Sequence, residues 1–247
     1  MARKFSNYID FLAACLDPGS VGKTPNSNYE NSWNETRNLA GLQEGLVRSI
    51  LGYAGESLVI GRALACGYNL FFKAWRDSKY DAVLDASGVL FRIEIKQSGD
   101  GSEISCTSGG RSGAQISREA DSREEVLSPE ESDFLIGVHT FSGKCWIVPT
   151  EVIFFRGAKT NETWALEDYV EKWKIFSQPP SGFTLKEIQQ GFRHLAIEEL
   201  RLVAGKLKIT DAPDLNYKFS PRNKTKILKS EREWYILEIW RAIFKSI

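Results

Sequence analysis

The sequence has only two histidines, His139 and His194, and four scattered cysteines with no Cys-x-x-Cys pair. Histidine-based metal centres and His-dependent catalytic triads are therefore poor candidates. The cysteine pattern favours reduced thiols in a cytosolic protein over a zinc site or a disulfide framework. No apolar run approaches the ~18 residues of a membrane-spanning helix, and the N-terminus lacks the apolar stretch of a secretory signal. We therefore expect a cytoplasmic protein with no membrane partner.

The chain also lacks net charge, because 32 lysines and arginines balance 32 acidic residues. This balance argues against a protein that coats nucleic acid indiscriminately, although a cleft with a basic rim remains possible.

A phosphate-binding P-loop is missing as well. Gly22-Lys23-Thr24 resembles the end of that motif, but Asp17 stands where its first glycine is required.

Three charged residues, Asp81, Glu94 and Lys96, lie in two consecutive strand-like runs. Residues 80–85 and 89–96 are joined by the short turn Ala86-Ser87-Gly88, which predicts an antiparallel hairpin. Side chains alternate along a strand, so Glu94 and Lys96 point the same way while Ile93 and Ile95 point into the packing. Asp81 then comes beside Glu94 and Lys96, and two carboxylates share one patch with an ammonium group.

This patch has the composition of a site for a hard cation. Mg²⁺ binds through one or two carboxylates, keeps several waters and completes its shell with a phosphate substrate. We expect Asp81, Glu94 and the backbone carbonyl of Ile95 to hold Mg²⁺, with Mn²⁺ able to replace it. Lys96 can orient a metal-activated water or stabilise charge that develops on the phosphate.

The ordinary alternative is a half-exposed strand with alternating polar residues. A Glu-x-Lys pair alone carries little information, because such strands are common. Here the strand that contains the pair is mostly apolar, and charges at the end of a buried strand favour a functional site.

Glu56 lies upstream in residues 55–67, a segment whose apolar spacing predicts a helix that ends at Gly67. Residues 68–75 then read as a strand. Glu56 can face the sheet from the first turn of this helix, or it can simply be an acid at a helix start. The nearby Glu44 is an alternative candidate for the helix carboxylate.

A glutamate on a helix, a strand, the Tyr80-Asp81 strand and the Glu94-Ile95-Lys96 strand follow one another in this order. This order resembles the PD-(D/E)xK nuclease superfamily over roughly residues 40–150. The resemblance implies an α/β fold with a mixed sheet flanked by helices, a restriction-endonuclease-like core. It also implies that Asp81 and Glu94 are metal ligands, Lys96 is the catalytic lysine and Glu56 supports the metal through water. Tyr80 departs from the pattern, which has proline there.

We divide the chain into an N-terminal arm (1–40), a nuclease core (41–155) and a helical C-terminal extension (156–247) packed on the core. In the core we also expect a strand at 103–107, a polar helical stretch at 115–126 and a hairpin from strands at 132–138 and 144–149. In the C-terminal extension we expect helices at 163–176, 184–203 and 230–244. The second of these has a possible Thr184–Glu187 capping box.

Candidate contacts to DNA phosphates come from two regions. Arg111 precedes the polar stretch and Arg118 lies within it. Residues 218–229 contain five cations and no acid, including Arg222, Lys224 and Lys226. The alternative for each is an ordinary solvated surface.

The leading hypothesis is a Mg²⁺-dependent endonuclease that cuts double-stranded DNA. The resemblance favours a homodimeric type II restriction enzyme from a prokaryotic or phage-like source, because a twofold dimer matches a palindromic site. A homing or junction-resolving endonuclease of the same fold shares this chemistry. Two other classes remain open: a non-catalytic DNA- or protein-binding module, and a sugar hydrolase that uses Asp81 and Glu94 but leaves Lys96 without a role.

Overall fold

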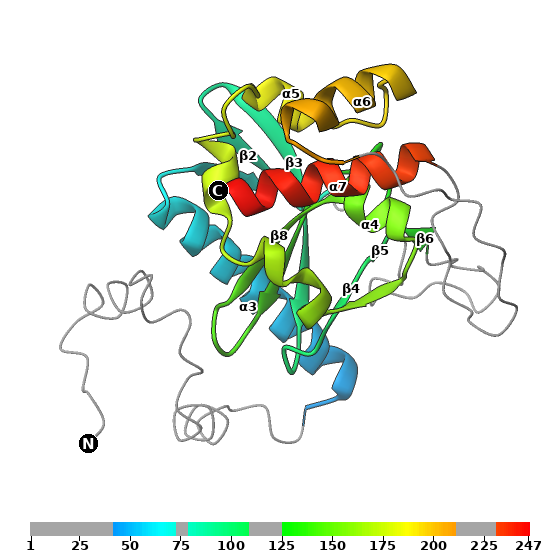
Figure 1. Cartoon of the computed structure of the whole chain (residues 1–247). Coiled ribbons are helices and arrows are strands. Elements are labelled where there is room, and N and C mark those ends of the chain that lie inside the picture. Colours follow the sequence, from blue (N-terminus) through cyan, green and yellow to red (C-terminus); the bar gives the residue numbers. More distant parts are fainter. Residues whose placement is uncertain (1–41, 73–78, 109–124, 211–230) are drawn as a thin grey trace, which may run out of the picture.

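The computed structural model describes residues 42–72, 79–108, 125–210 and 231–247 of the chain. Its centre is a five-stranded mixed sheet in which the order is β1-β2-β3-β7-β8 (Figure 1). Neighbouring strands are antiparallel except for β3 and β7, which run parallel. The predicted α/β class, a mixed sheet flanked by helices, is confirmed. The strands of this sheet are β1 (Asn69–Phe72), β2 (Ala82–Ala86), β3 (Val89–Ser98), β7 (Phe134–His139) and β8 (Cys145–Pro149).

The hairpin of β2 and β3 confirms the predicted tight turn. Ala86 pairs with Val89, so only Ser87 and Gly88 form the loop, with φ angles of 54° and 86°. Two positive φ angles are typical of a type I′ turn, whose twist matches that of the strands. The Asp85 carboxylate accepts a hydrogen bond from the Gly88 N–H at 2.8 Å and holds the turn. The strands themselves differ from prediction by one or two residues at their ends.

One face of the sheet is covered by α3 (Glu44–Ala65), which begins eleven residues earlier than predicted. It ends as expected, with Gly67 at a φ of 84°. The helix crosses the sheet at Gly55, where an added Cβ would lie 3.2 Å from both Gln97 Cβ and Val138 Cγ1. A glycine at this crossing lets the helix backbone approach β3 and β7 closely.

The opposite face of the sheet carries β4 (Glu103–Ser105). Its Ile104 packs over Gly137, where any side chain would collide with it. The strand predicted at 103–107 is in fact two strands, because Cys106 separates β4 from β5 (Thr107–Ser108). Their antiparallel partners are β9 (Thr160–Glu162) for β4 and β6 (Glu125–Val126) for β5.

The strand pairs β4–β9 and β5–β6 correct two further predictions. The C-terminal region is not purely helical, because β9 belongs to it and pairs with the core strand β4. The polar helix expected at 115–126 is wrong at its end, where residues 125 and 126 form β6. Its first part, up to residue 124, lies outside the described residues. The hairpin expected around Gly143 is confirmed by β7 and β8.

The first of the three C-terminal helices is also different from prediction. Residues 163–176 form two short 3₁₀ helices, η1 (Thr163–Tyr169) and η2 (Trp173–Phe176), with an extended link between them. In the link, Val170 bridges Trp146 of β8, and Glu171 has a φ of 52°. The Glu171 carboxylate accepts the Cys145 N–H at 2.8 Å. Pairing with the sheet edge therefore replaces the continuous helix.

The helix predicted at 184–203 is interrupted. Its start is confirmed, because Thr184 and Glu187 form the capping box at the beginning of α5 (Leu185–Gln190). Gly191, with a φ of 67°, ends α5, and α6 (Ile197–Lys206) begins six residues later. The last predicted helix is confirmed as α7 (Glu231–Ser246), which packs against α6 and against α4 (Thr150–Arg156).

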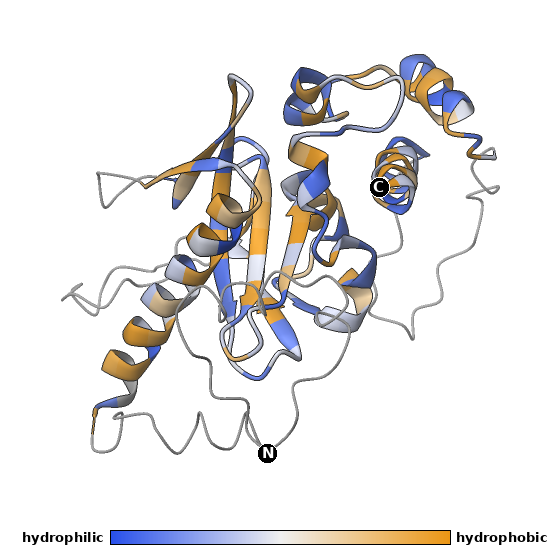
Figure 2. Ribbon diagram, turned by 90° about the vertical axis from the view of Figure 1, so that its left-hand side faces the viewer, coloured by the Kyte–Doolittle hydropathy of each residue, from blue (hydrophilic) through white to orange (hydrophobic). Residues whose placement is uncertain are grey.

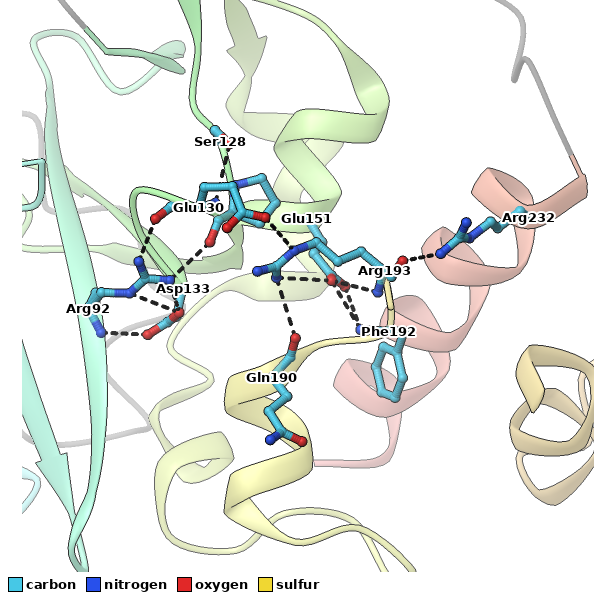
Figure 3. Close-up of polar contacts among 10 residues, drawn as sticks. Arg92, Ser128, Glu130, Asp133, Glu151, Gln190, Phe192, Arg193 and Arg232 are labelled. Atoms are coloured by element: carbon cyan, nitrogen blue, oxygen red, sulfur yellow. Dashed lines mark hydrogen bonds and ion pairs between the residues drawn. The ribbon is translucent and has the colours of Figure 1, made fainter. Parts of the chain in front are cut away.

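The cause of the interruption is the buried carboxylate of Glu151, at the start of α4 (Figure 3). It accepts hydrogen bonds from the N–H groups of Phe192 and Arg193 at 3.0 and 2.8 Å, and from Trp240 Nε1 at 2.8 Å. Arg193 also approaches it with its guanidinium, at 3.6 Å. One carboxylate thus joins α4, the 192–193 segment and α7.

Gly191 is required by this arrangement, and Gly191→Ala is expected to destabilise the protein by about 2–4 kcal/mol. A methyl group at this position would collide with the Glu151 carboxylate, and the φ of 67° is strained for alanine. The matched control is Gly205→Ala in α6, where nothing lies within 4 Å of the added Cβ. Alanine favours a helix, so this control should be neutral or slightly stabilising in thermal unfolding. Equal melting temperatures for the two variants would contradict the account.

The core is rich in aromatic side chains that lie edge to face. Phe176 of η2 is 5.1 Å from Phe91 and 5.0 Å from Phe134, measured between ring centroids, and 5.9 Å from Tyr68. Such pairs add to the free energy of burial. In the C-terminal region Tyr169, Trp173 and Trp240 are also buried, whereas Trp164 is exposed. Within the described ranges, no helix is long and apolar enough to cross a membrane.

Candidate functional site

Asp81 lies immediately before β2 and opposite Glu94 of β3, because the register pairs Ala82 with Ile93. Its N–H donates to the Ile93 carbonyl at 2.9 Å, which continues the ladder by one residue. Its Oδ2 accepts the N–H of Ile95 at 2.9 Å. The carboxylate is therefore held against the backbone of β3, between the two residues whose side chains complete the patch.

Glu94 and Lys96 point to the same face of β3, as alternation along the strand predicts. Glu94 Oε1 and Lys96 Nζ form an ion pair at 2.6 Å. Asp81 and Glu94 are 9% and 8% exposed, whereas the Lys96 side chain is 25% exposed. Two nearly buried carboxylates thus lie beside an ammonium group that reaches toward solvent. Buried charges of this kind are costly unless they are paired, so their presence favours a site.

The neighbours of the pair, Ile93 and Ile95, are buried against the core on the other face, as predicted. Within a strand, the N–H and C=O of one residue point to the same side. The Ile95 N–H points toward Asp81, so its carbonyl also points toward the side of the sheet where Asp81 lies. The backbone oxygen expected as a third ligand is therefore on the side of β3 where Asp81 lies.

Glu56 lies in the middle of α3, not in its first turn, because the helix begins at Glu44. The alternative of a dipole-stabilised acid at a helix start is therefore wrong for Glu56. Glu56 is half-buried and follows Gly55, which touches Gln97 of β3. Because side chains alternate along a strand, α3 lies on the face of β3 opposite to the side chains of Glu94 and Lys96. Glu44 opens the helix, but its side chain lies outside what the structure describes.

The donor set fits a hydrated hard cation better than an all-protein cage. Across the described ranges, no three His, Cys, Asp or Glu side chains come together as a metal cluster. Glu56 therefore does not join Asp81 and Glu94 in a three-carboxylate site. Two carboxylates and a carbonyl are what Mg²⁺ requires when water and substrate phosphate supply the rest.

The cysteines do not contribute a soft ligand. Burial raises the pKa of the Cys106 and Cys145 thiols, and it raises that of the exposed Cys66 as well. These thiols are therefore neutral at physiological pH, whereas a metal binds the thiolate. Cys66, Cys106 and Cys145 form no disulfide, and Cys15 lies outside the described residues.

Arg92 shares the face of Glu94 and Lys96 and was not among the residues predicted for the site. It does not point a free charge at the site, because its guanidinium holds Asp133 at 2.7 Å and the Pro129 and Glu130 carbonyls (Figure 3). The Arg92 N–H also donates to Asp133, at 2.7 Å. The sequence feature that could have identified Arg92 is its alternation with Glu94 and Lys96 along β3. Arg92 fixes the turn that precedes β7, and so acts in structure.

A second ion pair involves a residue close to Asp81 in the sequence. Lys79, two residues before Asp81, binds Glu131 at 2.9 Å. Burial alone would raise the pKa of Glu131, but the interactions with Lys79 and Ser108 outweigh it, and the pKa is lowered. The predicted phosphate-binding residues all lie outside the described residues: Arg111, Arg118, Arg222, Lys224 and Lys226.

No protein family model matches the chain, and no curated protein matches it either. Among solved structures, a match is the structure of a bacterial homing endonuclease, I-Ssp6803I, at 17% sequence identity and a TM-score of 0.43. The match covers 53% of this chain and 93% of that chain. The functional assignment therefore rests on the residues of the site.

Proposed function

We propose that the protein is a Mg²⁺-dependent endonuclease of the PD-(D/E)xK superfamily that hydrolyses phosphodiester bonds in double-stranded DNA. The observation that carries the proposal is the hydrogen bond from the Ile95 N–H to Asp81. It fixes one carboxylate between Glu94 and Lys96, so that two acids and an ammonium group form one patch.

Asp81, Glu94 and the Ile95 carbonyl would hold the ion, and Glu56 would support it through water. When bound, Mg²⁺, or Mn²⁺ in its place, supplies Lewis acidity to a phosphate oxygen and lowers the pKa of a water. Lys96 extends further into solvent than the two acids, so its ammonium can meet the scissile phosphate and stabilise charge that develops there. The ion pair with Glu94 orients Lys96 before substrate arrives.

Phosphodiester hydrolysis uses all three side chains, whereas the alternatives do not. A sugar hydrolase built on Asp81 and Glu94 leaves Lys96 without a role. A purely DNA-binding module gains nothing from two nearly buried carboxylates, because they repel the phosphate backbone. A bound cation would neutralise that repulsion, so that the same patch could bind a phosphate.

Within this chemistry we favour a homodimeric type II restriction endonuclease in the cytoplasm. A homing or junction-resolving endonuclease is the alternative, and the substrate distinguishes them. Plasmid and phage DNA incubated with Mg²⁺ should yield discrete fragments if the enzyme recognises a sequence. A smear would indicate a nonspecific enzyme, and selective cutting of branched DNA would indicate a junction resolvase.

Lys96→Ala is expected to lower the cleavage rate by about 10²–10³-fold, the range for loss of one group that stabilises transition-state charge. DNA binding should change little, because one exposed cation contributes little to affinity. The control is Lys144→Ala, which removes a lysine paired with Glu167 on the surface and should leave cleavage unchanged. A rate unaffected by Lys96→Ala would remove lysine from the mechanism.

A further inference from the structure

An ion pair joins the chain segments on either side of β3, the strand that bears Glu94 and Lys96. Lys79 leads into β2 and Glu131 leads into β7, and their side chains meet at 2.9 Å. In the sheet, β3 lies between β2 and β7. The Lys79–Glu131 pair therefore spans β3.

The pair lies on the face of β3 that carries the site. Arg92 points to this face, because it alternates with Glu94 along the strand. Its guanidinium binds the Pro129 and Glu130 carbonyls, so the turn that contains Glu131 lies on the same face (Figure 3). Figure 2 shows α3 along one side of the sheet, and this is the other face. Two residues of a strand span about 7 Å, so the turn meets β3 one alternate position away from Glu94.

Glu131 is the supported partner of the pair and Lys79 is the exposed one. The Glu131 N–H donates to the Ser128 carbonyl at 2.9 Å, and its carboxylate also interacts with Ser108. The Glu131 side chain is 20% exposed, whereas that of Lys79 is 72% exposed. A lysine ammonium has three donors, so Lys79 can hold Glu131 and still donate to a ligand that arrives from solvent. A fixed acid thus holds an exposed cation on this face of β3.

Lys79 is within reach of a substrate that occupies the site. It lies two residues before Asp81, so the two Cα atoms are at most about 7 Å apart. Each DNA strand carries one phosphate per about 3.4 Å of helix axis. With one phosphate at Lys96, its neighbours on the strand therefore come within range of the Lys79 side chain. Because Asp81 and Glu94 repel phosphates, a cation here offsets that repulsion.

We propose that Lys79 binds a backbone phosphate beside the scissile one and that Glu131 positions its ammonium for this contact. The inference rests on the proposed function, because DNA is the ligand. The contact is independent of sequence, since a phosphate carries no base information, and it fixes the register of the strand on the site. The negative charge of Glu131 at the same time weakens the attraction between Lys79 and the phosphate.

The two partners should change DNA affinity in opposite directions. Binding of a short random-sequence duplex to the full chain is measured in EDTA at several salt concentrations. Lys79→Ala should weaken binding about threefold and reduce the slope of log K against log salt by about 0.9, the contribution of one phosphate contact. Glu131→Gln keeps an oxygen that can accept from Lys79 but removes the charge, so binding should strengthen about threefold.

The Lys144–Glu167 pair provides the matched control. It has the same 2.9 Å distance, and Lys144 precedes β8, the edge strand on the opposite side of the sheet from β1. Lys144→Ala and Glu167→Gln should leave both the affinity and the salt slope unchanged. All four variants should fold, because surface ion pairs add little stability, and thermal unfolding checks this.

Three results would overturn the contact: a salt slope that Lys79→Ala leaves unchanged, weaker binding by Glu131→Gln, or an equal effect of Lys144→Ala. Weaker binding together with lower melting temperatures in both the Lys79 and the Glu131 variants would mean that the pair only stabilises the fold. A wild type that binds no duplex at low salt would contradict both the contact and the proposed function. The predicted slopes without cleavage in Mg²⁺ would contradict the nuclease and leave the Lys79 contact intact.

Discussion

Replacement of Asp81 by asparagine is expected to reduce DNA cleavage by a factor of about 10³ or more, in the upper range for loss of one electrostatic contact at an active site. Asparagine keeps the size of the side chain and an oxygen that can accept the Ile95 N–H. The variant therefore keeps the local geometry and loses only the negative charge. Cleavage rates and thermal unfolding measured together separate the two effects.

Asp85→Asn is the matched control for this variant. Asp85 lies four residues later, on the same face of the same hairpin, and its carboxylate binds the Gly88 N–H of the turn. Asparagine can accept the same hydrogen bond, so cleavage by this variant should remain within about twofold of wild type. An equal loss of activity in both variants would mean that the hairpin, not the Asp81 charge, matters.

The largest effect on stability is expected for Glu151→Ala, with a loss of about 3–5 kcal/mol. The substitution leaves the N–H groups of Phe192, Arg193 and the Trp240 indole buried without their acceptor. It also creates a cavity where α4, α7 and the segment after α5 meet (Figure 3). For a chain of this length, the melting temperature should fall by about 10 °C.

Glu167→Ala provides the comparison for that prediction. Glu167 forms an ion pair with Lys144, but its side chain is 56% exposed. Exposed pairs of this kind contribute at most about 1 kcal/mol, so the melting temperature should change by only a few degrees. Equal shifts for the two glutamates would contradict a central role for Glu151.

The site hairpin could be predicted from sequence because all of its signals are local. The turn residues Ser87 and Gly88 have the positive φ angles that such loops require. The apolar alternation of β3 separates Ile93 and Ile95 from Glu94 and Lys96, and the short loop fixes the register that puts Asp81 opposite Glu94. What sequence did not reveal was the Ile95 N–H donor, because a backbone group carries no residue-specific signal.

The helix breaks were not predicted because hydrogen bonds to distant residues stabilise them, and at α5 the local signal, Gly191, was not used. The helical pattern after Thr184 is strong, but Glu151, some forty residues earlier, binds the N–H groups that a continuous helix would use. In the same way, pairing of Val170 with Trp146 of β8 divides the predicted helix at 163–176 into two 3₁₀ turns. Tertiary hydrogen bonds outweigh helix propensity at both places.

The length of α3 was underestimated for a different reason. Residues 44–54 have apolar side chains on the solvent-facing side as well as the buried side, so they do not show the one-sided periodicity typical of a surface helix. The residues that obscured the helix, Leu46, Ile50 and Tyr53, are all exposed.

The most direct test of the nuclease assignment is to form the protein–DNA complex in EDTA, add Mg²⁺, and follow strand breaks over time. The account predicts intact DNA before the addition, breaks that appear only after it, and none with Glu94→Gln. Breaks in EDTA would contradict metal dependence. DNA that stays bound and intact in both Mg²⁺ and Mn²⁺ would contradict catalysis by Asp81, Glu94 and Lys96.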